Sequence, residues 1–162
     1  MKTALTITLL LTAASLAQMM EKPEIEWVKL YFPDQYSYFK SIIETEDGGF
    51  AATMIIDADT TYSFYRLDSD GNMLWAARSD LDYQEGNQVE ELSNGDFIVT
   101  GHGRETPTSS VALMLGKYDS NGVEIWTKLY ESNYNASEKG QSFCELPDGG
   151  FAVCGKIDIM GN

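Results

Sequence analysis

The chain has 162 residues, of which 43% are apolar, 22% charged and 12% aromatic. This composition is typical of a folded globular protein and excludes disorder for most of the chain. Lys and Arg total 11 against 25 Asp and Glu, a formal net charge of -14, which argues against nucleic acid or anionic lipid as a partner.

The N-terminal residues have the pattern of a secretory signal peptide. Lys2 gives a positive start, residues 4–16 are apolar apart from Thr and Ser, and small side chains stand at Ser15 and Ala17. We therefore expect a signal peptide at residues 1–17, cleaved after Ala17, and a mature protein that is secreted, extracellular or periplasmic. We expect no transmembrane segment, because no stretch approaches the roughly 20 apolar residues that a span requires.

Beyond this segment, two motifs recur at an interval of roughly 50 residues, which indicates a repeat architecture. The first motif is Asp47–Phe50, seen again as Asn94–Phe97 and Asp148–Phe151. The second motif is Asp68–Trp75, repeated as Asp119–Trp126, with the pattern Asp-x-x-Gly-x-x-x-Trp. An additional copy of its end is present at Trp27–Tyr31, which matches Trp126–Tyr130.

Each motif predicts a β-hairpin, because Asp-Gly or Asn-Gly between apolar runs supplies the positive φ angles of a tight turn. One repeat unit is thus four strands, a to d. We expect strands a and b of the third copy at Ser142–Leu146 and Phe151–Gly155, and strands c and d of the second copy at Ala112–Tyr118 and Glu124–Tyr130.

The b strands are almost continuously apolar, as in Phe97–Val99 and Phe151–Cys154. A sheet wet on one face would alternate polar and apolar residues, so both faces of these strands should be covered. Four-stranded antiparallel units covered by their neighbours on both faces are typical of β-propeller blades. The sequence therefore predicts an all-β β-propeller, with a solenoid of hairpins as the weaker alternative.

The Asp-x-x-Gly-x-x-x-Trp pattern resembles the tryptophan-docking repeat of quinoprotein-like β-propellers, and the Asp-Gly-Gly-Phe hairpins resemble repeats of large exported bacterial propeller proteins. The resemblance implies that the tryptophan wedges between adjacent blades and that the Asp-Gly turn lies at a blade corner. It implies no quinone chemistry, and we expect no cofactor. The structural repeat residues are Trp27, Trp75 and Trp126 together with Gly71 and Gly122.

The repeats within residues 18–162 amount to about two and a half blades: blade one at about 40–79, blade two at about 87–131 and half of blade three at about 141–157. Closed propellers typically have 4 to 8 blades, so we expect the ring to be incomplete. Two explanations remain open. The chain is the N-terminal piece of a longer reading frame, or two chains self-associate, with the Trp27 strand of one completing the other.

Two groups of residues are candidates for a calcium site and for a disulfide, and each also has a simpler explanation as part of the fold. Asp68, Asp70 and Asn72 partly resemble a calcium loop, although Asp, Asn and Gly are also common turn residues, which we favour. Cys144 and Cys154 lie on one hairpin; if residues 148–150 form its loop, they stand directly opposite, and a two-residue turn offsets them by one position. A disulfide and small apolar packing are equally compatible with this pair.

His102 is the only histidine, and it follows the apolar part of a b strand. It would be an acid or base beside Glu105 or a carboxylate of the next blade, but a surface-loop position without a partner is the more common role for such a residue.

An aromatic cluster precedes blade one, and rim aromatics of this kind either hold sugar rings or cover a blade edge: Tyr31, Phe32, Tyr36, Tyr38 and Phe39.

The sequence contains no identifiable pair of acid and nucleophile. We therefore expect a non-catalytic binding or scaffolding role, with an extracellular carbohydrate or protein as ligand, because function in repeat folds lies in their variable loops. The alternatives are a hydrolase acting on polysaccharide, a carbohydrate-binding lectin-like protein, and a purely structural repeat of a larger surface protein.

Overall fold

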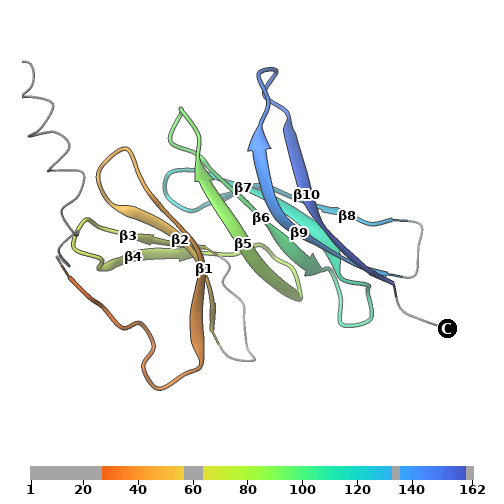
Figure 1. Cartoon of the computed structure of the whole chain (residues 1–162), viewed down its shortest axis with the longest axis horizontal. Helices are drawn as coiled ribbons and strands as arrows, with labels where there is room; N and C mark the ends of the chain where they lie inside the picture. The colour runs from red at the N-terminus through yellow and green to blue at the C-terminus, as the bar shows by residue number, and fades with distance from the viewer. Residues whose placement is uncertain (1–26, 57–63, 133–135, 160–162) are drawn as a thin grey trace, which may run out of the picture.

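The computed structural model describes residues 27–56, 64–132 and 136–159, which form three antiparallel sheets and no helix. Sheet one consists of β1 (Ser37–Glu44), β2 (Phe50–Ile56), β3 (Phe64–Leu67) and β4 (Met73–Ala77). Sheet two consists of β5 (Tyr83–Glu91), β6 (Phe97–Arg104), β7 (Ala112–Tyr118) and β8 (Glu124–Tyr130). Sheet three has only β9 (Ala136–Glu145) and β10 (Phe151–Ile159). The sheets follow one another in chain order (Figure 1).

The all-β prediction is confirmed, and within each sheet every strand pairs with its neighbour in sequence. The expected bounds of β7 and β8 agree with the structure, whereas β9 begins earlier and β10 ends later than expected. No helix among the described residues has the length and apolar character needed to cross a membrane. The predicted signal peptide at residues 1–17 lies outside the described residues.

The hairpin loops explain why the sequence repeats Asp-Gly. In the first loop, Gly48 N donates to Thr45 O at 2.8 Å and Thr45 N donates to Gly49 O at 2.9 Å. Gly48 has a φ of +80°, a left-handed conformation that costs little only for glycine. The same conformation recurs at the other four turn glycines, with φ between +74° and +81°, as predicted: Gly71, Gly95, Gly122 and Gly149.

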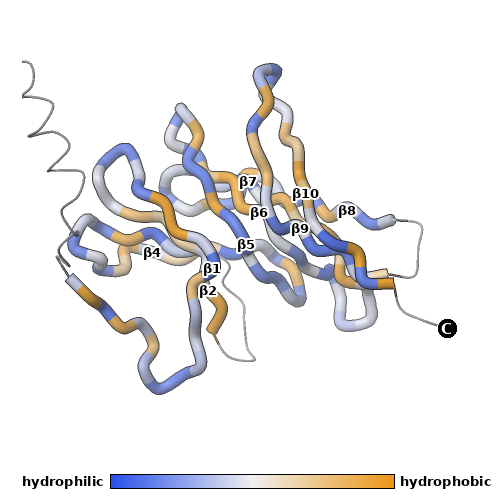
Figure 2. The backbone as a smooth tube through the Cα atoms, viewed as in Figure 1, coloured by the Kyte–Doolittle hydropathy of each residue, from blue (hydrophilic) through white to orange (hydrophobic). Residues whose placement is uncertain are grey.

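Two hydrophobic clusters join the sheets face to face. The cluster between sheets one and two includes Phe64, Phe97, Val99, Met114 and Tyr118, none more than 1% exposed. The cluster between sheets two and three is smaller and is built on Ile98, Leu115 and Phe143. Sheet two contributes to both clusters and is therefore covered on both faces; Figure 2 shows its apolar residues in orange around the labels β6 and β7.

The second strand of each sheet begins with an apolar run, but the three copies differ in burial. Most residues of β2 and β6 are buried, whereas every residue of β10 is exposed or half-buried. β2 and β6 each lie between two partner strands, while β10 pairs only with β9. The expected cover on both faces is therefore present for sheets one and two and is missing for β10.

A β-bulge interrupts the first strand of each sheet at the same place. The extra residue is Lys40 in β1, Asn87 in β5 and Gln141 in β9. Bulges bend a strand and redirect its side chains, and they often occur beside functional sites. The equivalent bulges give the three sheets a common register, so that positions can be compared between repeats.

Candidate functional site

Two of the three repeated tryptophans dock onto a turn glycine of the following sheet. Trp75 of β4 packs edge-on against Phe64, with ring centroids 5.0 Å apart, and lies 6.2 Å from Phe97 of sheet two. A Cβ atom placed on Gly122 would lie 2.7 Å from the Trp75 ring, so only glycine leaves room for the indole. The β7–β8 turn of sheet two thus receives a side chain from sheet one.

Trp27 makes the equivalent contact with sheet one. Its ring lies 5.8 Å from Phe50, and a Cβ atom on Gly71 would approach it to 2.9 Å. Trp27 is 40% exposed, but its indole lies on the β3–β4 turn and not free in solvent. Tyr31 adds a hydrogen bond from its hydroxyl to Gly71 O at 2.5 Å. Of the five structural repeat residues, four therefore form two indole–glycine pairs.

Trp126, the remaining repeat residue, lines an open groove of about 540 Å³ between sheets two and three. Its register position in β8 is that of Trp75 in β4, because Lys117 pairs with Trp126 as Arg66 pairs with Trp75. Lys128 lies over the indole at 5.5 Å. The groove has these lining residues: Leu113, Leu115, Trp126, Lys128, Tyr130, Gly149, Gly150, Phe151 and Val153.

A polar seam, formed by Lys40, Tyr83, Glu85, Asn87 and His102, crosses the sheets at the bulges. Lys40 Nζ donates to Glu85 Oε2 at 3.0 Å and to Asn87 Oδ1 at 2.8 Å, which joins sheet one to sheet two. Asn87 Nδ2 donates onward to Gly140 O of β9 at 2.6 Å. The Asn87 side chain therefore connects Lys40 of β1 with β9.

His102 lies in this seam, and the prediction that it occupies a surface loop is wrong. β6 continues to Arg104, so His102 is a strand residue only 4% exposed. Its Nε2 lies 3.6 Å from Glu85 Oε2 and 3.4 Å from the Tyr83 hydroxyl, which also donates to Glu85. The carboxylate partner is thus Glu85 of the facing strand and not Glu105.

The surroundings of His102 favour its neutral form. Burial lowers its pKa to about 4, and the positive charges of Lys139, Lys40 and Lys156 act in the same direction, while the Glu85 carboxylate opposes them. Burial and the bond to Glu85 raise the pKa of Tyr83. A neutral imidazole sealed from water is a structural group and is poorly placed for acid–base catalysis on a bound substrate.

Acid should destabilise the protein through His102. Because its pKa is about 4 in the folded chain against an ordinary 6.5, the unfolded chain binds more protons between these values, and the free energy of unfolding falls as the pH is lowered. Through His102 alone, we expect the free energy of unfolding to fall by about 2 kcal/mol when the pH is lowered from about 7 to about 5. Urea denaturation of wild type and His102→Gln at both pH values measures it; parallel losses in the two proteins would contradict the assignment.

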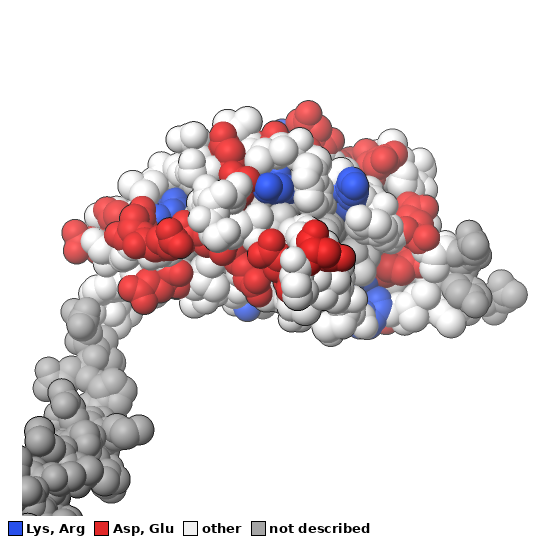
Figure 3. Space-filling model, turned by 90° about the horizontal axis from the view of Figure 1, so that it is seen from above, with Lys and Arg blue, Asp and Glu red and all other residues white. Residues whose placement is uncertain are grey.

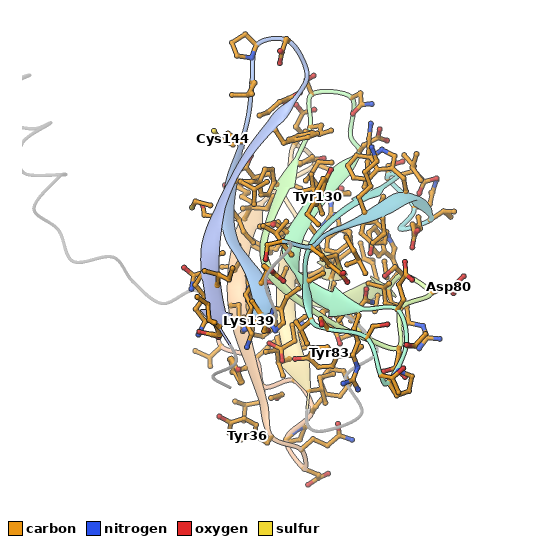
Figure 4. All side chains as sticks on the ribbon, turned by 90° about the vertical axis from the view of Figure 1, so that its right-hand side faces the viewer. Tyr36, Asp80, Tyr83, Tyr130, Lys139 and Cys144 are labelled. Atoms are coloured by element: carbon orange, nitrogen blue, oxygen red, sulfur yellow. The ribbon has the colours of Figure 1, made fainter. Side chains whose placement is uncertain are left out.

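Sequence reasoning did not identify Lys40, Tyr83, Glu85 or Asn87. A signal was present, because the facing pair Tyr38 and Ile55 of sheet one is replaced by Glu85 and His102 in sheet two and by Lys139 and Lys156 in sheet three. This position therefore changes from apolar to polar while the flanking pattern is retained. Lys139 and Tyr83 lie in the same part of the molecule in Figure 4, well away from Cys144.

The Asp68–Asn72 loop behaves as a turn. The Asp68 carboxylate accepts hydrogen bonds from Asp70 N at 3.0 Å and from Asn72 N at 2.7 Å. Asn72 Oδ1 is engaged by Lys29 Nζ at 2.6 Å. Oxygens committed to the turn itself are poor cation ligands, and the described residues contain no group of three or more His, Cys, Asp or Glu that would hold a metal.

Cys144 and Cys154 are both free and exposed. The predicted loop is displaced by one residue, because Leu146 and Gly150 close the turn and leave residues 147–149 as the loop. Cys144 consequently pairs with Ala152, and Cys154 pairs with Ser142. The two cysteines are therefore neither directly opposite each other nor offset by one position. Figure 4 shows Cys144 on the side of the β9–β10 hairpin that points away from sheet two.

Two thiols should therefore react without unfolding. We expect an aromatic disulfide reagent to titrate two equivalents per native chain, since both side chains are exposed. Cys144→Ser and Cys154→Ser should each lower the count by one. A native count of zero that rises after reduction would show a disulfide and would contradict the observed register.

The aromatic cluster was expected to precede blade one, but only Tyr31, Phe32 and Tyr36 do so, because β1 begins at Ser37 and includes Tyr38 and Phe39. Tyr31 contacts Phe39 with ring centroids 5.4 Å apart, and Phe32 contacts the buried Tyr65 at 6.5 Å. Tyr36 contacts Tyr38 at 5.7 Å and is 70% exposed. Tyr38 and Phe39 are exposed as well, so Tyr31 and Phe32 are the members of the cluster that cover sheet one. In the view of Figure 3, acidic side chains spread over the surface and basic ones form small isolated patches.

Comparison with known proteins assigns no family. No protein-family model matches the chain, and no curated protein matches it at a significant level.

Proposed function

We propose that the chain is a non-catalytic binding or scaffolding module built from β-propeller blades, in a secreted or cell-surface protein. The observation that carries this proposal is the repeated indole–glycine contact, Trp27 on Gly71 and Trp75 on Gly122. Sheets one and two each receive one indole from the preceding segment at the equivalent turn glycine, which is how identical units stack about an axis. The apolar second strand, covered on both faces in sheets one and two, supports the same arrangement.

A binding role is favoured over catalysis by the state of the polar groups. Within the described residues, the buried histidine is held neutral and Glu85 is engaged by Lys40, Tyr83 and His102. The groove beside Trp126, in contrast, combines aromatic rings, a lysine and two glycines. Aromatic faces of this kind also stack on sugar rings, so a lectin-like role is the second candidate.

Incubation of the purified protein with a panel of insoluble polysaccharides separates these roles. A binding module should release no reducing sugar, and a lectin-like one should also be retained by at least one polysaccharide. Retention should fall at least tenfold in Trp126→Ala, because the indole would be the stacking platform. Reducing-sugar release that co-purifies with the protein would overturn the non-catalytic role.

Export is tested separately, by N-terminal sequencing of the periplasmic or secreted form, which should begin at Gln18.

A further inference from the structure

Cys144 and Cys154 lie on the same face of the β9–β10 hairpin. Cys144 pairs with Ala152, and residues that pair directly share a face of the sheet. Cys154 follows Ala152 by two positions, so its side chain points to that face as well. The other face packs on sheet two through Phe143 and Val153. Both thiols therefore point away from sheet two, as Figure 4 shows for Cys144, and both are free and exposed.

The two cysteines occupy diagonal corners of a patch whose other two members are small. Cys154 pairs with Ser142 as Cys144 pairs with Ala152, and the register is regular between these two pairs. Ser142 and Ala152 are both exposed. Diagonal neighbours in an antiparallel pair have Cα atoms about 7–8 Å apart and Cβ atoms somewhat closer. The two sulfurs can therefore turn toward each other across the patch without displacing a large side chain.

This diagonal spacing fits a metal bridge and does not fit a disulfide. A disulfide cannot join Cα atoms more than about 7 Å apart unless the backbone moves. A metal ion between the sulfurs lengthens the link by about 2.3 Å, the length of one further metal–thiolate bond. Thiolates select soft ions, of which Cu(I) and Zn²⁺ are the common ones. The pair is thus within reach of a shared soft ion.

The number of ligands distinguishes between these two ions. Zn²⁺ in protein sites almost always has four ligands or three and a water. The described residues contain no group of three or more His, Cys, Asp or Glu that would hold a metal, so the two thiols have no further ligand of this kind beside them. Cu(I) is a soft ion whose coordination is complete with two thiolates in a line. The ligand set therefore favours Cu(I).

Both cysteines are particular to sheet three. The register of the three sheets shows which residues take their places elsewhere: Ile43 and Thr53 in sheet one, and Glu90 and Thr100 in sheet two. The repeat itself therefore does not require a thiol at either position. The only two cysteines of the chain occur together in one sheet, on one face and within reach of one ion.

We propose that Cys144 and Cys154 form a binding site for one Cu(I) ion, held between the two thiolates on the face of sheet three that points away from sheet two. Each thiol gives up its proton on binding, so one ion releases two protons and no electron is transferred. Once the first sulfur is bound, the second binds within the same hairpin and gains from its high effective concentration. The site is independent of the proposed function, because it uses neither the indole–glycine contacts nor the Trp126 groove.

The test titrates the reduced protein, without oxygen, with Cu(I) held by bicinchoninate, a coloured competing chelator. We expect the protein to remove one equivalent of Cu(I) per chain and to gain ultraviolet absorption from thiolate-to-copper charge transfer. Cys144→Ser and Cys154→Ser should each weaken Cu(I) binding by about a hundredfold or more, because the remaining thiolate binds alone. Zn²⁺ should bind at least about a hundredfold more weakly than Cu(I), since two of its usual four ligands are missing.

Two variants separate the geometry of the site from its thiol content. Ala152→Ser changes another corner of the patch and keeps both thiols, so it should bind Cu(I) within about threefold of wild type. Cys154→Ser combined with Val153→Cys also keeps two thiols but places one on the opposite face of β10. This double variant should bind as weakly as Cys154→Ser alone, with circular dichroism as the check that it is folded.

The proposal is overturned if the wild-type protein takes no Cu(I) from the chelator, or if the double variant binds as tightly as wild type. Zn²⁺ that competes on equal terms with Cu(I) would also overturn it, because the site would then have more than two ligands. Gel filtration of the copper-loaded protein should match that of the metal-free protein. A copper-dependent dimer would show that the ion joins two chains and would contradict a site within one hairpin.

Discussion

Trp75→Ala should lower the free energy of unfolding by about 3 kcal/mol, the lower end of the loss seen for buried tryptophan. The indole contacts Phe64 and Phe97 across two sheets and fills the space above Gly122, so its removal opens a cavity at their interface. Chemical denaturation followed by tyrosine fluorescence and circular dichroism measures the loss. If Trp75→Ala does not fold, Trp75→Phe should show a smaller loss in the same direction.

Trp126→Ala is the matched control, because Trp126 has the same register position but faces the open groove. It should cost about 1 kcal/mol or less, in line with the smaller apolar area that it removes from water. Equal losses for Trp75→Ala and Trp126→Ala would contradict the conclusion that the first indole is docked and the second is not.

Gly122→Ala should be destabilising for two reasons that can be separated. Its φ of +81° costs a non-glycine residue about 1–2 kcal/mol, and the new Cβ would lie 2.7 Å from Trp75. Displacing the ring should add about 1–3 kcal/mol. The same denaturation experiment gives the total.

Gly95→Ala isolates the conformational part, because Gly95 has a φ of +79° and a Cβ atom placed on it would meet no other atom within 4 Å. It should therefore lose only about 1–2 kcal/mol. The double variant Trp75→Ala with Gly122→Ala should lose less than the sum of the single changes, since the clash disappears with the ring. Strict additivity would show that the two residues do not touch.

The sequence predicted the parts of the fold that local chemistry determines. Glycines such as Gly48 and Gly122 take the turn conformation that Asp-Gly pairs favour, and β7 and β8 begin and end where their apolar and β-branched runs do. The contact of Trp75 with the next repeat was expected from the resemblance of its motif to tryptophan-docking repeats, and the indole does lie on Gly122.

Pairings across the sheets were not predictable in the same way. The polar seam depends on bulges at Lys40 and Asn87, which shift the register by one residue and leave no mark in a hydropathy pattern. The same kind of one-residue displacement moved the loop between β9 and β10 and separated Cys144 from its expected partner. β10 extends past Gly155 because Lys156 pairs with Lys139, which an apolar pattern cannot indicate.

Side chains of β5 also form hydrogen bonds with backbone groups on the edge of β9. The Gln88 amide accepts from Phe143 N at 2.9 Å and donates to Phe143 O at 3.4 Å, and Asn87 caps Gly140 O. Unpaired strand edges invite ribbon-like aggregation. Because amide side chains of β5 already occupy the backbone groups of Phe143 and Gly140 O, addition of a foreign strand at these points of β9 is disfavoured.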